Sequence, residues 1–171
     1  VLALLAVALL PSQFQVVGAL SGLPFVVIGA LAARRQWQLP SAARVARTQE
    51  ALARMDWPAF ADLLERSFRR DGFTVLRSKA ASVDFELERK GRRMVVCARR
   101  WKSARTGLET LRALQSSREA TDAPDALYIG LGPLTDTARP FAAEHRIAVW
   151  SAPELALALR GLPLGDVTTG R

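Results

Sequence analysis

Cysteine and histidine are almost absent from this sequence. Its 171 residues include one cysteine, Cys97, and one histidine, His145. A single cysteine excludes an intrachain disulfide, and without a CxxC motif or a Cys/His cluster the usual zinc sites are excluded too. A nucleophilic pair could only join Cys97 to His145, and nothing in the sequence around either residue supports one. We therefore expect a partly buried thiol and a surface histidine at a helix end.

Acidic residues are scarce relative to basic ones. The chain carries 24 lysines and arginines against 16 aspartates and glutamates, a formal net charge of +8 and an isoelectric point of about 11.1. This balance favours anionic partners, such as nucleic acid or lipid headgroups. Charge alone does not choose between them, because many basic proteins bind no nucleic acid.

Two runs at the start of the chain lack charged residues altogether. Residues 14–33 form an uncharged stretch of 20 residues, about the length that crosses a ~30 Å hydrocarbon core. Another apolar run, residues 1–10, precedes it, and only a short polar turn separates the two. They predict a transmembrane helical hairpin over residues 1–35, with its first helix truncated because the chain does not begin with methionine. A buried soluble helix is the alternative for the second run, and a signal-peptide core for the first.

Arginines follow the second apolar run directly, at positions 34, 35, 44 and 47. Positive residues stay on the cytoplasmic side, so we expect both ends of the hairpin to face the cytoplasm of a bacterial inner membrane. Residues 36–54 are interpreted as a basic juxtamembrane linker or a basic surface helix, whose arginines could contact anionic lipid. A domain follows at residues 55–162, and residues 163–171 form a tail.

The domain alternates helical and strand patterns. Asp56 is suited to cap a helix with Pro58 in its first turn, and Gly72 is suited to end it. The remaining patterns predict strands at 73–78, 126–131 and 147–151, a hairpin over 83–102, and helices at 106–120, 135–144 and 153–160. The helix at 106–120 has Thr106 as its expected cap. This order, αβββαβαβα, predicts an α/β fold with a mixed sheet flanked by helices.

The hairpin has a register that its turn and its hydrophobic pattern both indicate. Lys90 and Gly91 provide a two-residue turn, which places Asp84 opposite Cys97. Alternation then separates a polar face from an apolar one. The polar face contains Asp84, Glu86, Glu88, Arg93, Val95, Cys97 and Arg99. Geometry alone favours an ordinary solvated surface with cross-strand ion pairs over a functional site on this face.

The motifs of the domain resemble those of the Mrr-type branch of the restriction endonuclease-like, PD-(D/E)xK, superfamily. The resemblance covers about 105 residues, nearly the whole domain. It begins with a helix that ends in a glycine and an aromatic residue ("RRDGF") and continues with an acid in "VDFEL" and a strand "CARRWK". A glycine, Gly107, then opens a helix. The later matches are "ALYIGL", "TDTARPFAAEHR" and "IAVWSAPELALALR".

The resemblance implies a metal-dependent nuclease site, from which this sequence departs. Asp84 falls on the metal-binding aspartate, Cys97 on a position that has glutamine or glutamate, and Arg99 on the catalytic lysine. An acid of the first helix is represented only by Asp62 or Glu65. Three of the four expected site positions therefore differ from the family pattern.

These departures change the expected chemistry. Magnesium, the implied cofactor of an active enzyme, prefers oxygen ligands, so the thiol of Cys97 is a poor ligand and Asp84 would need help from Glu86 or Glu65. Arginine is almost always protonated, so Arg99 cannot act as a general base, although it can hold a phosphate through two parallel hydrogen bonds. We expect cleavage to be weak or lost.

A basic stretch follows the site strand. Residues 89–105 contain eight basic residues and no acidic ones, which suits salt-sensitive, sequence-independent contacts with phosphates. Trp101 lies within it and could stack on a base, although packing in the core is the more common role. The residues expected to bind nucleic acid are Arg99, Arg100, Lys102 and Arg105.

The sequence therefore predicts a membrane-anchored, restriction endonuclease-like protein that binds DNA, with a degenerate active site. One alternative is an active endonuclease that uses Asp84 with Glu86 or Glu65. Another is an interaction module at the membrane with no role in nucleic-acid binding. A homodimer is possible, and no small-molecule substrate is expected.

Overall fold

The computed structural model describes residues 40–164. The transmembrane hairpin predicted for residues 1–35 lies outside the described residues, as does most of the predicted tail. Between residues 40 and 164, no helix is both long enough and apolar enough to cross a membrane.

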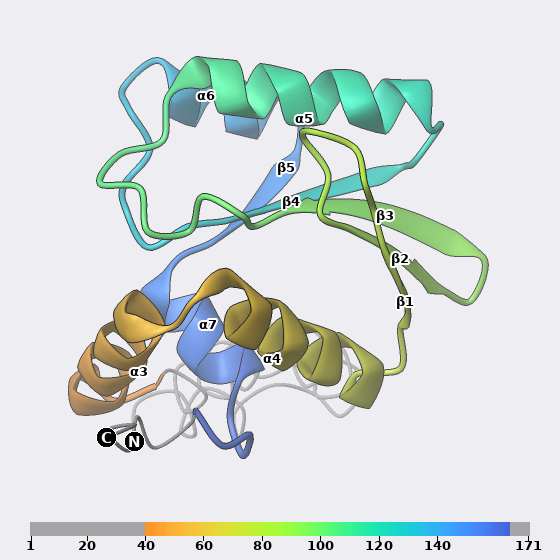
Figure 1. The fold of residues 1–171 in the computed structure, drawn as a ribbon. Helices are drawn as coiled ribbons and strands as arrows, with labels where there is room; N and C mark the ends of the chain where they lie inside the picture. The colour runs from red at the N-terminus through yellow and green to blue at the C-terminus, as the bar shows by residue number, and fades with distance from the viewer. Residues whose placement is uncertain (1–39, 165–171) are drawn as a thin grey trace, which may run out of the picture. The chain divides into compact units, whose positions relative to one another are not determined.

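A five-stranded sheet forms the centre of the described region, with the strands in the order β1-β2-β3-β4-β5 (Figure 1). The first three strands pair antiparallel, and β3 pairs parallel with β4, as β4 does with β5. This arrangement confirms the predicted mixed sheet. The strands are β1 (Thr74–Arg77), β2 (Phe85–Arg89), β3 (Arg92–Cys97), β4 (Asp125–Ile129) and β5 (Ile147–Trp150).

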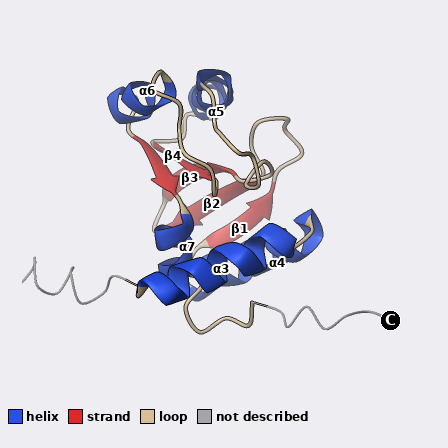
Figure 2. Ribbon diagram, turned by 90° about the vertical axis from the view of Figure 1, so that its left-hand side faces the viewer, coloured by secondary structure: helices blue, strands red, loops and turns tan. Residues whose placement is uncertain are grey.

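Helices cover both faces of the sheet (Figures 1 and 2). On one side lie α3 (Ala42–Arg54), α4 (Trp57–Arg70) and α7 (Ala152–Ala158); on the other lie α5 (Leu108–Ala120) and α6 (Ala138–Glu144). Each layer has its own hydrophobic core, because alternate residues of the strands point to opposite faces. The domain is therefore two helical layers around one sheet.

The hairpin has the register that the sequence predicts. Phe85 pairs with Val96 and Arg89 with Arg92. Lys90 and Gly91 both have positive φ angles, 53° and 75°, as a tight two-residue hairpin turn requires. Helix α5 packs over the polar face at Cys97, so this part of the face is core rather than solvated surface, in agreement with the partly buried thiol expected there.

Helix α4 begins and ends where its sequence indicates. The side chain of Asp56 accepts a hydrogen bond from the amide of Ala59 at 3.0 Å, and Pro58 lies in the first turn. Gly72 follows the helix with a φ angle of 86°, which suits glycine. Phe60 and Phe68 are buried against the sheet, so the hydrophobic face of this helix was also predicted correctly.

Two helices begin later than expected. Helix α5 starts after Gly107, because Thr106 is used elsewhere: it bridges to Leu134, and its hydroxyl bonds to Tyr128 at 2.7 Å. Helix α6 starts only at Ala138. Pro140 then falls in its first turn, where the missing N–H would have no intrahelical partner.

Helix α3 occupies most of the segment interpreted as a linker or a basic surface helix. Ser41 caps it by accepting a hydrogen bond from the amide of Arg44. Its Leu52 side chain is completely buried, and its Leu52 carbonyl accepts a hydrogen bond from the indole N–H of Trp101 at 3.0 Å. Residues 42–54 thus form a helix that packs into the domain.

Candidate functional site

The chain turns sharply where β3 ends. Cys97 is the last residue of the strand, and the amide of Trp101 donates to the carbonyl of Ala98 at 3.0 Å. Arg99 therefore lies in a turn rather than on the strand, where the sequence analysis placed it. Alternation along a strand could not reveal this, since the turn depends on hydrogen bonds that the amides of Ala98 and Arg99 donate to the carboxylate of Asp84, the residue before β2.

The carboxylate of Asp84 holds this turn. Its Oδ2 atom accepts hydrogen bonds from the amides of Ala98, at 2.7 Å, and Arg99, at 2.8 Å. Asp84 directly precedes β2, and its amide donates a hydrogen bond to the carbonyl of Val96 at 2.7 Å. Only 6% of Asp84 is exposed, so these donors replace water around a buried charge. The residue has a clear structural role, as a cap for two successive amides.

Arg99 closes over the other oxygen of the same carboxylate. Its Nε atom lies 3.0 Å from Oδ1 of Asp84, and its guanidinium lies over the ring of Trp57 at 5.3 Å from the ring centroid. The side chain is nevertheless 62% exposed. The structure therefore brings Asp84 and Arg99 together, as predicted, but as an ion pair between a buried carboxylate and an exposed guanidinium.

The register of the hairpin places Cys97 opposite Asp84, but the Cys97 side chain is shielded from solvent. It is 7% exposed, beneath α5. Burial raises the pKa of its thiol to about 12, and the negative charge of Asp84 contributes to the rise. The sulfur therefore stays protonated near neutral pH, which suits neither a nucleophile nor a metal ligand.

The two other candidate acids differ in their surroundings. Glu86 is half-buried on β2 and pairs with Val95 of β3 and Leu76 of β1. It borders a cavity of about 290 Å³ on the open face of the hairpin, together with Arg93. No hydrogen bond joins it to Asp84 in the described part of the chain.

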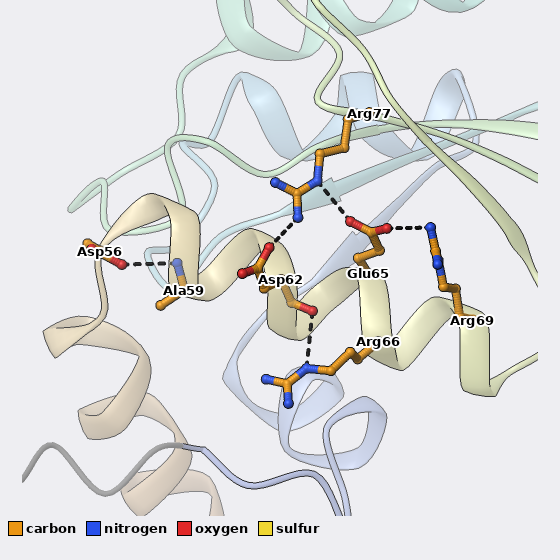
Figure 3. A network of polar contacts seen from close by, with 7 residues as sticks. All are labelled: Asp56, Ala59, Asp62, Glu65, Arg66, Arg69 and Arg77. Carbon is orange, nitrogen blue, oxygen red and sulfur yellow. Dashed lines mark hydrogen bonds and ion pairs between the residues drawn. The ribbon is translucent and has the colours of Figure 1, made fainter.

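Glu65 is engaged by arginines (Figure 3). Its carboxylate lies 2.8 Å from Nε of Arg77 and 2.6 Å from a terminal nitrogen of Arg69. Arg77 also binds Asp62, and the hydrogen bonds to Asp62 and Glu65 raise the pKa of its guanidinium. Arg77 was missed by the sequence analysis, and only its place on β1, beside α4, could have revealed it.

These residues do not fit a magnesium centre. Within residues 40–164, no three histidine, cysteine, aspartate or glutamate side chains gather in a way that could hold an ion. Asp84 is already bound by amides and by Arg99, and Glu65 is paired with Arg77. The thiol of Cys97 is protonated and unsuited to a hard cation.

The basic loop, residues 98–106, runs from the end of β3 to the start of α5. Four of its basic residues are exposed. They are Arg99, Arg100, Lys102 and Arg105. Among the described residues, no ion pair engages Arg100, Lys102 or Arg105. Arg92 of the hairpin, in contrast, pairs with Asp125 at 2.8 Å.

The basic loop is fixed to the body of the domain. Trp101 is 5% exposed and stacks on Phe60 with 4.6 Å between ring centroids, so its expected core role is confirmed. The carbonyl of Trp101 accepts a hydrogen bond from the amide of Leu131 at 2.8 Å, and the amide of Thr106 donates to the carbonyl of Pro133 at 3.0 Å. The exposed basic side chains therefore extend from a loop whose backbone is fixed to the domain.

Comparison with known proteins places this fold and this loop in a family. Residues 52–159 match the family model Mrr_cat, described as a restriction endonuclease. Because this match covers more than half of the chain, the chain belongs to the Mrr_cat restriction endonuclease family. No curated protein matches the chain.

Three solved structures are similar to parts of the chain. EndoMS in its apo form is 19% identical, with a TM-score of 0.40, over 53% of this chain and 44% of its own. The MspJI restriction endonuclease in complex with a 27-mer oligonucleotide is 17% identical, with a TM-score of 0.43, over 71% and 32%. A protein of unknown function is 14% identical, with a TM-score of 0.44, over 54% and 56%. The similarity thus spans about half or less of the length of these proteins.

Proposed function

We propose that this chain is a DNA-binding member of the restriction endonuclease family in which metal-dependent cleavage is weak or lost. The observation that carries the proposal is the environment of Asp84, whose carboxylate accepts two backbone hydrogen bonds and pairs with Arg99. A metal-dependent nuclease needs such an oxygen for its cation. Arg99 also cannot accept a proton from the attacking water, because a guanidinium remains charged.

The basic loop supports the DNA-binding half of the proposal. Its exposed cations lie in one short segment beside Asp84, and they are held by a buried tryptophan and backbone hydrogen bonds. Because the loop is already ordered, less conformational entropy is lost when it binds DNA. Contacts of this kind give affinity that falls steeply with salt concentration and depends little on sequence.

Plasmid cleavage by the full chain, with magnesium or manganese, tests the proposal. We expect no nicking or linearisation above the level of an Asp84→Ala control, while the plasmid is retarded on a gel at low salt. Cleavage that disappears in the control would establish an active endonuclease and would require Glu86 or another acid to complete the site. Absence of retardation at low salt would instead favour an interaction module without a role in nucleic-acid binding.

Two charge-reversed variants separate specific retention from the effect of net charge. Arg100→Glu lies in the basic loop, and Arg112→Glu carries the same charge change on the exposed side of α5, where Arg112 pairs with Glu109. The proposal expects Arg100→Glu to weaken retention much more than Arg112→Glu. Equal effects would mean that overall charge, and not the basic loop, retains DNA.

We propose in addition that residues 1–35 anchor the domain to a bacterial inner membrane, with the domain on the cytoplasmic side. The uncharged stretch at residues 14–33 and the arginines after it support this arrangement. DNA binding and anchoring are independent proposals, and either can fail without the other.

A further inference from the structure

Both carboxylate oxygens of Asp84 are engaged by groups of the protein itself, and the only cation among them is Arg99. One carboxylate oxygen accepts the amides of Ala98 and Arg99, and the other lies 3.0 Å from Nε of Arg99. A divalent ion that approached this carboxylate would have to displace the guanidinium, against the repulsion between two positive charges.

We propose that Arg99 takes the place of a divalent cation at Asp84, and that Asp84 orients the guanidinium toward a DNA backbone phosphate, so that DNA binding requires no divalent metal. This inference rests on the proposed DNA-binding function. It makes Asp84 a positioning residue and Arg99 the phosphate-binding residue.

The guanidinium has nitrogens left for this role. Asp84 engages Nε, and the two terminal nitrogens donate no hydrogen bond to another described residue. A guanidinium presents these terminal donors as a planar fork that can bind a phosphate bidentately. The side chain is 62% exposed, so the fork is open to solvent.

Two contacts restrict where the fork points. The Asp84 carboxylate is itself held by backbone amides, and the ring of Trp57 lies beneath the guanidinium at 5.3 Å. Trp57 is in turn packed against Trp101, with 5.8 Å between ring centroids. An arginine fixed from two sides loses less side-chain entropy when it binds phosphate than a freely rotating one.

Metal dependence is the first test. The affinity of the full chain for a fluorescein-labelled duplex is measured by anisotropy in EDTA and in Mg²⁺ at matched ionic strength. We expect dissociation constants that agree within about threefold, because phosphate contacts by arginine need no bridging ion. Binding that is lost in EDTA, or at least tenfold tighter in Mg²⁺, would overturn the inference and leave DNA binding itself established.

A variant pair tests the positioning role. Asp84→Asn and Glu109→Gln each remove one negative charge near the basic loop. Glu109 is 88% exposed, and Arg112 is its only ion-pair partner among residues 40–164. Charge alone predicts tighter binding for both. We expect Glu109→Gln to bind as well as the wild type or better, and Asp84→Asn to bind at least about threefold more weakly, because Arg99 loses its partner.

The salt dependence distinguishes positioning from damage to the fold. Loss of one phosphate contact lowers the slope of log Kd against log salt concentration by about 0.9, whereas a partly unfolded sample keeps the slope. We expect the lower slope in Asp84→Asn. An unchanged slope, or tighter binding like that of Glu109→Gln, would refute the positioning role.

Arg99→Lys keeps the test decisive if Asp84→Asn does not fold. It retains the charge at an exposed position but lacks the planar fork. We expect weaker binding with an unchanged melting temperature; affinity equal to the wild type would mean that charge alone suffices. Absence of DNA binding in the wild type under every condition would overturn the proposed function, and this inference with it.

Discussion

Asp84 illustrates how far a single residue can be interpreted from sequence. Its position in the hairpin and its proximity to Arg99 follow from the turn at Lys90 and Gly91, and the structure has both. Its use as an acceptor for two amides could not be predicted, because the sharp turn after Cys97 has no signature in a strand-like pattern. The same residue type thus serves as a cap where the family pattern implies a metal ligand.

Cys97 gives a prediction at the residue scale. Because its pKa is raised to about 12 by burial, the folded protein holds almost no thiolate at pH 8, whereas an unfolded cysteine with a pKa of about 8.5 is substantially ionised. We expect an aromatic disulfide reagent to modify Cys97 at least about a hundredfold more slowly in the native chain than in guanidinium chloride. The absorbance of the released thiolate measures both rates.

The difference between the pKa values of Cys97 in the folded and unfolded states also sets the sign of its pH effect on stability. Below the pKa of the unfolded thiol both states are protonated, so burial of Cys97 costs nothing in proton binding. Above it, the unfolded state loses its proton first and is favoured, so this group lowers stability as the pH rises beyond about 8.5. In the reagent experiment, rapid modification of Cys97 in the native chain at pH 8 would contradict a buried, protonated thiol.

Elements with strong local signals were predicted well, and those that depend on distant partners were not. Helix α4 has its own cap and its own apolar face, and both are confirmed. The predicted start of α5 was wrong because the hydroxyl of Thr106 bonds to Tyr128 and its backbone forms a β-bridge with Leu134, and both partners are far away in sequence. Leu52 was assigned to a segment outside the domain, and its burial depends on packing that periodicity over a short basic helix does not reveal.

Gly132 gives a prediction at the element scale, because it lets the loop after β4 approach the basic loop closely. A Cβ atom at this position would collide with the carbonyl oxygen of Ser103 and lie 2.6 Å from that of Ala104. Backbone atoms cannot rotate away, so the basic loop would have to move. We expect Gly132→Ala to destabilise the domain by about 1–3 kcal/mol and to weaken DNA binding. Thermal unfolding and anisotropy measure the two effects.

Gly107→Ala is the matched control for this loop. Gly107 also borders the basic loop, but a Cβ atom there would meet nothing within 4 Å. Replacing Gly107, the N-cap residue of α5, should lower the free energy of unfolding by less than about 1 kcal/mol. If both variants unfold at the wild-type temperature and bind DNA equally, the close approach at Gly132 does not hold the basic loop in place.

At the scale of the whole molecule, positive charge is divided between two uses. On the hairpin and β1, arginines are tied to acids and carbonyls within the fold, as Arg92 is to Asp125 and Arg77 is to Glu65. In the basic loop, Arg100, Lys102 and Arg105 are exposed, with no ion pair among the described residues. Net charge alone cannot separate these groups, which is why composition suggested anionic partners without indicating a surface. The fold supplies that distinction.

The membrane proposal gives the prediction for the whole chain. Arginines at positions 34, 35, 44 and 47 follow the uncharged stretch, and Arg44 and Arg47 are exposed on α3. Because positive residues near a membrane segment stay on the cytoplasmic side, a C-terminal fluorescent reporter should be active and a C-terminal alkaline phosphatase inactive in bacterial cells. Both fusions should remain in the membrane fraction after a carbonate wash, and deletion of residues 1–35 should release them. Phosphatase activity would refute the orientation, and a wild-type fusion recovered in the soluble fraction would refute the anchor while leaving the DNA-binding proposal intact.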